Sequence, residues 1–108
     1  MSDTERLAER LGECAKHISD LLDRGSNAPL GWAARLAAIG GAIRDTGRAA
    51  AAGRTDTLAE CRKQINKFLT HPGNDLPGWT RWEKCQPVYE AIAACGDAIS
   101  AHLDGMGR

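Results

Sequence analysis

The sequence predicts an all-α protein, a four-helix bundle built from two tandem helical hairpins. Alanine is abundant and β-branched residues are scarce, which favours helices over a β-sandwich. Four segments carry apolar residues at spacings of three and four, as one face of a helix does. The sequence also repeats, because a shift of 47 residues superposes Glu13-Cys14-x-Lys16-x-Ile18 on Glu60-Cys61-x-Lys63-x-Ile65.

The repeat extends through both predicted hairpins. Gly31-Trp32 falls on Gly78-Trp79 in the same register, which then slips by nine residues, so that Gly40 aligns with Gly96. The second copy therefore carries an insertion around residues 79–87. We expect one domain, 1–108, with a first hairpin over 3–47 and a second over 55–105.

The first and third helices share one apolar stripe. In the first helix Ser2 and Glu5 predict a capping box at the start, and Gly25 predicts the end. In the third, either Thr57 with Glu60 or the preceding Asp56 predicts the start, and His71-Pro72-Gly73 predicts the end. The two stripes consist of Leu7, Leu11, Cys14, Ile18, Leu21 and Leu22, and of Leu58, Cys61, Ile65, Phe68 and Leu69.

The second and fourth helices form the other half of each hairpin. The second is expected to begin near Pro29 and to fray around Gly47. Residues 46–56 are either a linker or continued helix, and their alanines favour partial helix. For the fourth, Pro87 predicts either a start or a kink, and we favour a short helix over 79–85 followed by a long one. The aligned mid-helix glycines, Gly40 and Gly96, indicate close approach between the second and fourth helices, or else simple drift.

Composition excludes several classes of function. The 14 basic and 14 acidic side chains cancel, so no global electrostatic attraction to nucleic acid or an anionic membrane is expected. No apolar stretch is long enough to span a membrane. The first residues lack the apolar core of a secretory signal, so a cytoplasmic location with reduced thiols is expected. The excess of arginine over lysine and the many alanines suggest a bacterial or phage gene.

The cysteines are the strongest candidates for chemistry. Cys14 and His17 lie one helical turn apart, and with Cys61 and Cys95 they form a weak alternative metal site. No Cys-x-x-Cys pair is present, so these cysteines are expected to be core residues and no cofactor is expected. Cys85 follows Lys84, whose charge would lower the thiol pKa and make Cys85 the most reactive cysteine. No nucleophile or phosphate-loop motif occurs, which predicts a protein that is not an enzyme.

The inserted segment carries the predicted partner site. Trp82 has no counterpart in the first repeat, and tryptophan and arginine are enriched at interface hot spots. We therefore expect an adaptor or inhibitor that occludes or bridges another protein; homodimerisation is possible. The alternatives are that Trp82 covers the core, or that the basic 62–84 segment binds nucleic acid. The predicted docking residues are Trp79, Arg81, Trp82, Lys84, Arg62, Lys63 and Lys67.

Overall fold

Helices account for all the regular secondary structure in residues 3–22, 28 and 31–106, the part of the chain that the computed structural model describes. The all-α class is therefore confirmed. The elements are α1 (Asp3–Leu22), α2 (Trp32–Ala51), α3 (Leu58–Leu69), the 3₁₀ helix η1 (Pro72–Asp75), α4 (Pro77–Thr80) and α5 (Cys85–Met106). No helix within these ranges is both long and apolar enough to cross a membrane.

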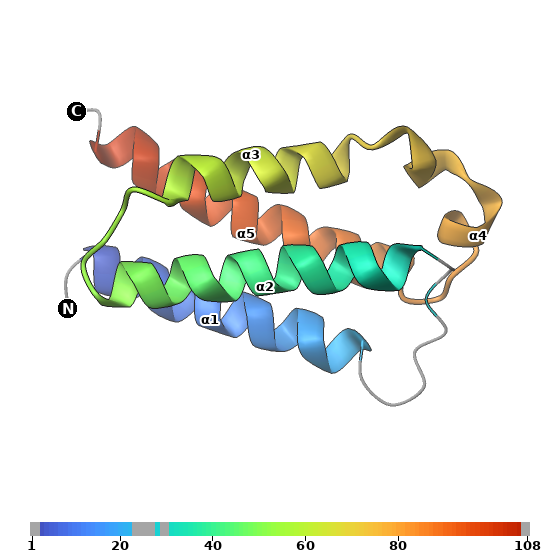
Figure 1. Ribbon diagram of the computed structural model, residues 1–108, viewed down its shortest axis with the longest axis horizontal. Helices are drawn as coiled ribbons and strands as arrows, with labels where there is room; N and C mark the ends of the chain where they lie inside the picture. Colours follow the sequence, from blue (N-terminus) through green and yellow to red (C-terminus); the bar gives the residue numbers. More distant parts are fainter. Residues whose placement is uncertain (1–2, 23–27, 29–30, 107–108) are drawn as a thin grey trace.

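The four long helices pack side by side around one core. α1 lies along both α2 and α5, and α3 lies along both α5 and α2. In Figure 1, α2 runs across the front between α1 and α3, and α5 passes behind it. The short elements η1 and α4 connect α3 to α5 at one end of this arrangement.

The predicted apolar stripes form the core. Each helix is amphipathic, so packing the stripes together removes them from water, which stabilises the fold by about 1.5–3 kcal/mol for each large side chain. The side chains with no more than 1% of their surface exposed include Leu11, Ile18, Leu36, Ile43, Leu58, Ile65, Val88, Ile92 and Ile99.

The second helix continues further than a fraying end at Gly47 predicts. α2 runs to Ala51, so the first part of the 46–56 segment is helix. Ala49 and Ala50 are buried, and a Cβ on Gly47 would lie 3.2 Å from the Cβ of Leu11. At Gly47 the helix therefore lies close against α1. It ends just before Gly53, whose φ of 81° suits glycine.

The inserted segment differs from the predicted helix over 79–85. α4 spans only Pro77–Thr80, and α5 already begins at Cys85. Pro87 therefore lies in the first turn of α5, where a missing backbone N–H removes no intrahelical hydrogen bond. Of the two alternatives for this proline, the start of a helix is the one observed.

The mid-helix glycines contact the helix of their own hairpin. A Cβ on Gly40 would lie 3.7 Å from Cγ2 of Ile18, and a Cβ on Gly96 would lie 3.0 Å from Cγ2 of Ile65. The predicted close approach between the second and fourth helices is thus wrong. The glycines instead let α2 approach α1, and α5 approach α3.

The predicted helix caps are only partly observed. Ser2, Gly25 and Pro29 lie outside the described residues. Thr57 is the N-cap residue of α3, as expected, but its side chain makes no capping hydrogen bond. α2 begins at Trp32 after Gly31, whose φ is 88°.

Candidate functional site

The two tryptophans of the inserted segment lie in the core. Trp79 has 1% of its surface exposed and Trp82 has 8%. The Trp79 ring stacks on Trp32, with centroids 4.3 Å apart and planes inclined by 23°, and its centroid is 5.7 Å from that of Trp82. These indoles cover the end of the core, so they do not offer a partner the exposed anchors that the sequence suggested.

A wider aromatic cluster surrounds this stack. The Phe68 ring meets both Trp32 and Trp79 edge-on, with centroids 5.9 and 6.0 Å apart. The guanidinium of Arg35 lies 4.3 Å above the Trp32 ring, in cation–π geometry. Arg35 therefore covers the cluster on its outer side.

Hydrogen bonds from Asn74 and Tyr89 hold the end of α3 in place. The amide Nδ2 of Asn74 donates to the carbonyl oxygens of Phe68 and Leu69 at 3.2 and 2.8 Å. The hydroxyl of Tyr89, on α5, donates to the carbonyl of Leu69 at 2.7 Å. These donors satisfy carbonyls that have no partner within the helix, and they hold α3 against α5.

The predicted basic residues remain at the surface. Lys63, Lys67 and Arg81 are exposed, and Arg62 and Lys84 are half-buried. Lys67 lines a groove between α2 and α3. With the neighbouring indoles buried, stacking on exposed bases has no aromatic platform at Trp79 or Trp82.

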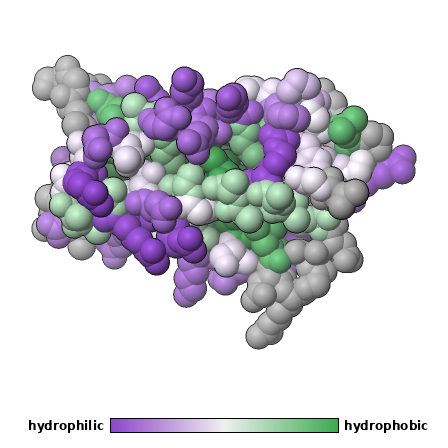
Figure 2. All heavy atoms as spheres, in the orientation of Figure 1, coloured by the Kyte–Doolittle hydropathy of each residue, from purple (hydrophilic) through white to green (hydrophobic). Residues whose placement is uncertain are grey.

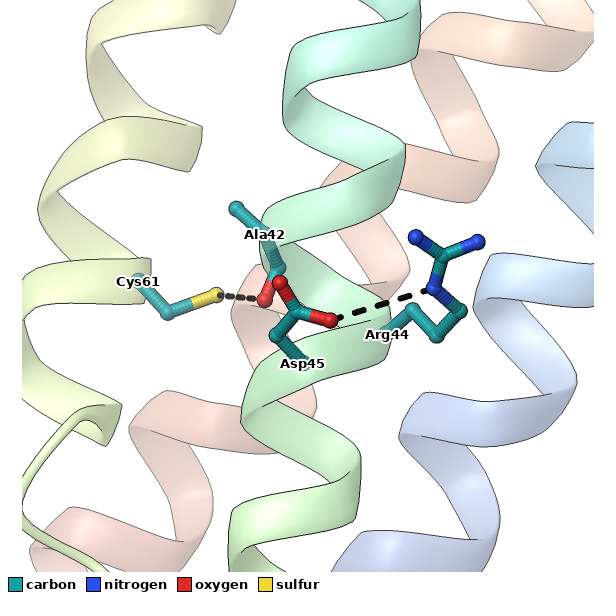
Figure 3. Close-up of polar contacts among 4 residues, drawn as sticks. All are labelled: Ala42, Arg44, Asp45 and Cys61. Carbon is teal, nitrogen blue, oxygen red and sulfur yellow. Dashed lines mark hydrogen bonds and ion pairs between the residues drawn. The ribbon is translucent and has the colours of Figure 1, made fainter.

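The pKa shifts of the cysteines differ from those that the sequence predicts. Burial raises the pKa of Cys85, so the predicted lowering by Lys84 is wrong. The pKa of Cys14 is instead lowered, to about 7, mainly by a hydrogen bond with Cys95. Burial raises the pKa of Cys61, whose Sγ points from α3 to the Ala42 carbonyl oxygen of α2 at 4.0 Å (Figure 3).

The alternative metal site is not assembled. Within the described ranges, no group of three His, Cys, Asp or Glu side chains could hold a metal ion. His17 is exposed on α1, whereas Cys95 is completely buried on α5. The set Cys14, His17, Cys61 and Cys95 therefore does not converge as metal ligands.

The outer face of α2 is a surface that the sequence reasoning missed. Ala33, Ala34, Ala37 and Ala38 are all exposed on this helix. Figure 2 shows a pale green band across the middle of this view, where α2 runs in Figure 1, with purple hydrophilic atoms above it and at its lower left. We call these four residues the alanine face. The paired alanines, four residues apart, are visible in the sequence, but a search for stripes of large apolar residues passes over them.

An open groove of about 650 Å³ borders the alanine face on the α1 side. Its floor includes Ile18 and Leu36, and small residues such as Gly12 and Gly41 leave it hollow. Lys16 also lines it, together with Arg44, which extends from α2 towards α1 in Figure 3. Oδ1 of Asp45 lies 3.9 Å from Nε of Arg44. Both side chains are well exposed, so this ion pair contributes little to stability.

A second groove, of about 260 Å³, borders the alanine face on the α3 side. Ile39 and Phe68 form its apolar part, and Arg35, Lys67 and His71 supply its polar part. No carboxylate is among the described residues that line either groove. The outer face of α2 is therefore an apolar strip between two hollows with basic linings.

No protein-family model matches the sequence, and no curated protein or solved structure is significantly similar to the chain.

Proposed function

We propose that the protein is a non-enzymatic binding module that accepts an α-helix of a partner protein along the outer face of α2. The observation that carries this proposal is the alanine face, which lies between two open grooves with basic linings. By covering a partner's helix, the module would hide it from other proteins, which is inhibition by occlusion.

A helix is the occupant that suits this shape. Small side chains let two helix backbones approach closely, and large side chains of the incoming helix can enter the grooves on either side. Recognition of an amphipathic helix in a groove is a common binding mode, in which anchors recur at spacings of three and four. Ala15, Leu22 and Gly41 line the groove on the α1 side and keep part of their surface exposed, so they would receive such anchors.

The basic residues beside the alanine face indicate which charges a partner helix should carry. Lys16 and Arg44 lie on one side of the alanine face, and Arg35 and Lys67 lie on the other. A partner helix with apolar anchors and flanking carboxylates is complementary to this arrangement. A long phosphate backbone is less suitable, because the chain has no net charge and the strip itself is apolar.

Two synthetic amphipathic helices test the proposal. They share one apolar face and differ only in their flanks, which carry glutamate in one peptide and lysine in the other. Amide chemical-shift changes are mapped on the full chain. We expect the acidic peptide to shift signals at Ala34, Ala37 and Gly41, and the basic peptide to have little effect. Equal responses, or shifts confined to Lys63 and Arg81, would contradict the proposal.

A pair of variants separates binding from folding. Ala37→Arg places a long cation on the exposed alanine face, and Ala94→Arg places the same side chain at an exposed position of α5. We expect Ala37→Arg to weaken binding of the acidic peptide at least ten-fold and Ala94→Arg to leave it unchanged. Sedimentation equilibrium of the unliganded protein completes the test: if a second copy covers α2, the face is an interface between copies, and the proposal fails.

We further propose that the four long helices form a four-helix bundle that arose by duplication of one hairpin. The relation of Gly40 to Ile18 supports this, because the aligned pair Gly96 and Ile65 has the same relation in the other hairpin. The equivalent residues Trp32 and Trp79 also stack on each other. In this view the inserted segment closes one end of the bundle, and α2 carries the binding face.

A further inference from the structure

The groove between α2 and α3, of about 260 Å³, is lined by three basic side chains. Arg35 comes from α2, Lys67 lies in the last turn of α3, and His71 follows that helix. We call this hollow the basic groove. No described carboxylate lines it, and none of the described side chains forms an ion pair with Arg35 or Lys67. The basic groove therefore collects positive charge that no described group neutralises.

Aromatic rings hold the guanidinium of Arg35 in place. Its Cζ lies 4.3 Å from the centroid of the Trp32 ring and 5.3 Å from that of the Phe68 ring. The Arg35 side chain is half-buried, and both rings are buried. Cation–π contacts restrict the side chain but leave its charge without a counter-ion. An anion that binds Arg35 therefore meets a guanidinium that has already lost much of its conformational freedom.

A backbone hydrogen bond fixes which nitrogen of His71 can donate. The amide N–H of Gly73 donates to Nδ1 of His71, with the two nitrogens 2.8 Å apart. Because a backbone N–H only donates, Nδ1 is the acceptor, and the proton of the neutral ring lies on Nε2. The ring also meets Trp32 edge-on, with centroids 5.7 Å apart. His71 therefore supplies an N–H donor next to the ring that holds Arg35, even when it is uncharged.

The charges and donors of the basic groove suit one kind of anion. Arg35 and Lys67 together carry two positive charges, and His71 adds a further N–H. A phosphate monoester carries a charge of about −1.5 to −2 near neutral pH and offers three acceptor oxygens. A carboxylate or a phosphate diester carries only one negative charge. The monoester is therefore the anion whose charge matches the groove.

We propose that the basic groove is a binding site for a phosphate monoester. Arg35 and Lys67 balance its charge, and Nε2–H of His71 donates to one of its oxygens. This site goes beyond the helix-binding role of α2, because a small phosphate monoester occupies the basic groove without a partner helix. The same chemical group can come from a free small molecule or from a phosphorylated side chain of the partner helix.

Three small anions test the charge match on the full chain. Near pH 8, methyl phosphate is largely a dianion, dimethyl phosphate is a monoanion that resembles a nucleic-acid backbone, and acetate is a simple carboxylate. Each is titrated at constant ionic strength while amide chemical shifts are followed. We expect methyl phosphate to shift signals at Gln64, Lys67 and His71 and to bind at least ten-fold more tightly than the other two. Equal binding of all three anions would overturn the proposal.

Two lysines of α3 provide a matched pair of variants. Lys67 lines the basic groove, whereas Lys63, one turn earlier and equally exposed, does not line it. Lys67→Gln should weaken methyl phosphate binding on the order of ten-fold, as the loss of one charge-assisted hydrogen bond does. Lys63→Gln should leave the affinity unchanged. Equal losses in the two variants would mean that only the general positive charge of α3 attracts the anion, and the proposed site would be wrong.

Substitution of His71 separates its two nitrogens. His71→Asn keeps an acceptor near the place of Nδ1 but removes the Nε2–H donor, so it should weaken methyl phosphate binding. His71→Gln keeps a donor near the place of Nε2 and should bind more tightly than His71→Asn. Unchanged affinity in both variants would contradict the donation from His71. If neither variant folds, as judged by circular dichroism, the pair Lys67→Gln and Lys63→Gln decides the matter.

A phosphorylated peptide identifies the source of the phosphate. The acidic amphipathic peptide is prepared with one flanking phosphoserine and compared with methyl phosphate. If a partner helix supplies the group, the phosphopeptide should bind at least ten-fold more tightly, and Ala37→Arg should remove this advantage. If a free small molecule supplies it, the two should bind alike. Both results support the site. If methyl phosphate does not bind, the site is wrong even when the unphosphorylated peptide binds; if it binds and no peptide does, only the helix-binding role fails.

Discussion

Trp32 and Trp79 stack on each other with their ring centroids 4.3 Å apart. Trp32 begins α2 and Trp79 lies in α4, so the contact joins residues from the two halves of the chain. In the sequence both follow a glycine, and they lie 47 residues apart. The stack therefore links the halves at the end of the core where the inserted segment lies.

Removing this stack should lower the free energy of unfolding by a large amount. Trp79→Ala should lower the free energy of unfolding by about 3–5 kcal/mol, because it deletes a fully buried aromatic side chain and leaves a cavity. Urea denaturation followed by far-ultraviolet circular dichroism measures the change. A loss below about 1 kcal/mol would be typical of an exposed tryptophan and would contradict the observed burial.

Trp82 should tolerate substitution better than Trp79. Its Nε1 is buried and has no hydrogen-bond partner among the described residues, a situation that costs about 1–3 kcal/mol. Trp82→Phe removes this polar atom and keeps an aromatic ring. We therefore expect Trp82→Phe to reduce the free energy of unfolding less than Trp79→Phe does, in the same urea experiment. The reverse order would contradict this explanation.

Replacing the mid-helix glycines Gly41 and Gly96 by alanine should change the free energy of unfolding in different ways. Alanine is favoured over glycine within a helix by about 0.5–1 kcal/mol, and a Cβ on Gly41 would meet nothing within 4 Å. Gly41→Ala should therefore raise the free energy of unfolding. Gly96→Ala should not, because its Cβ would lie 3.0 Å from Cγ2 of Ile65. Adding Ile65→Leu, which removes the Cγ2 methyl that this Cβ would meet, should recover part of the difference, which a double-mutant cycle measures.

The effects of substituting Asn74 and Tyr89 on stability should be coupled through the Leu69 carbonyl. It accepts hydrogen bonds from Asn74 and from Tyr89. Tyr89→Phe should cost about 0.5–1.5 kcal/mol, and Asn74→Ala somewhat more, because Asn74 also bonds Phe68. Since one remaining donor still satisfies the shared carbonyl, the double variant should lose more stability than the two single losses together. Simple additivity would show that the carbonyl does not couple them.

Stability should depend on pH through Cys14 and Cys95. The pKa of Cys14 is about 7 in the folded protein, below the ordinary 9.0 of the unfolded chain, so the unfolded state binds more protons between pH 7 and pH 9. Stability should rise over this range by on the order of 1 kcal/mol. Above pH 9 it should fall, because the folded protein keeps the Cys95 proton that the unfolded chain loses.

The control for this pH dependence is Cys14→Ser, studied with a non-thiol reductant present. The rise between pH 7 and pH 9 should disappear in the variant, whereas contributions from other groups remain. Thermal unfolding at a series of pH values measures the difference. An identical rise in both proteins would show that another group causes it.

The helices and their buried faces could be predicted from the sequence. The stripe residues of α1 and α3 became core because spacings of three and four place them on one side of a helix. The short elements were harder, since α4 has a single turn and carries little periodicity. The alanines after Gly47 favour partial helix, but the point at which α2 ends depends on the burial of Gly47, Ala49 and Ala50, which composition does not reveal.

The sequence by itself determined that this chain is helical and which residues avoid water, because amphipathic periodicity is a local property. Only the tertiary structure decided the surroundings of the tryptophans, the cysteines and the alanines of α2. Trp79 and Trp82 became core rather than surface, Cys14 rather than Cys85 has the lowered pKa, and four alanines of α2 became an open face. These outcomes depend on which side chains meet across helices, and that is a matter of packing between distant parts of the chain.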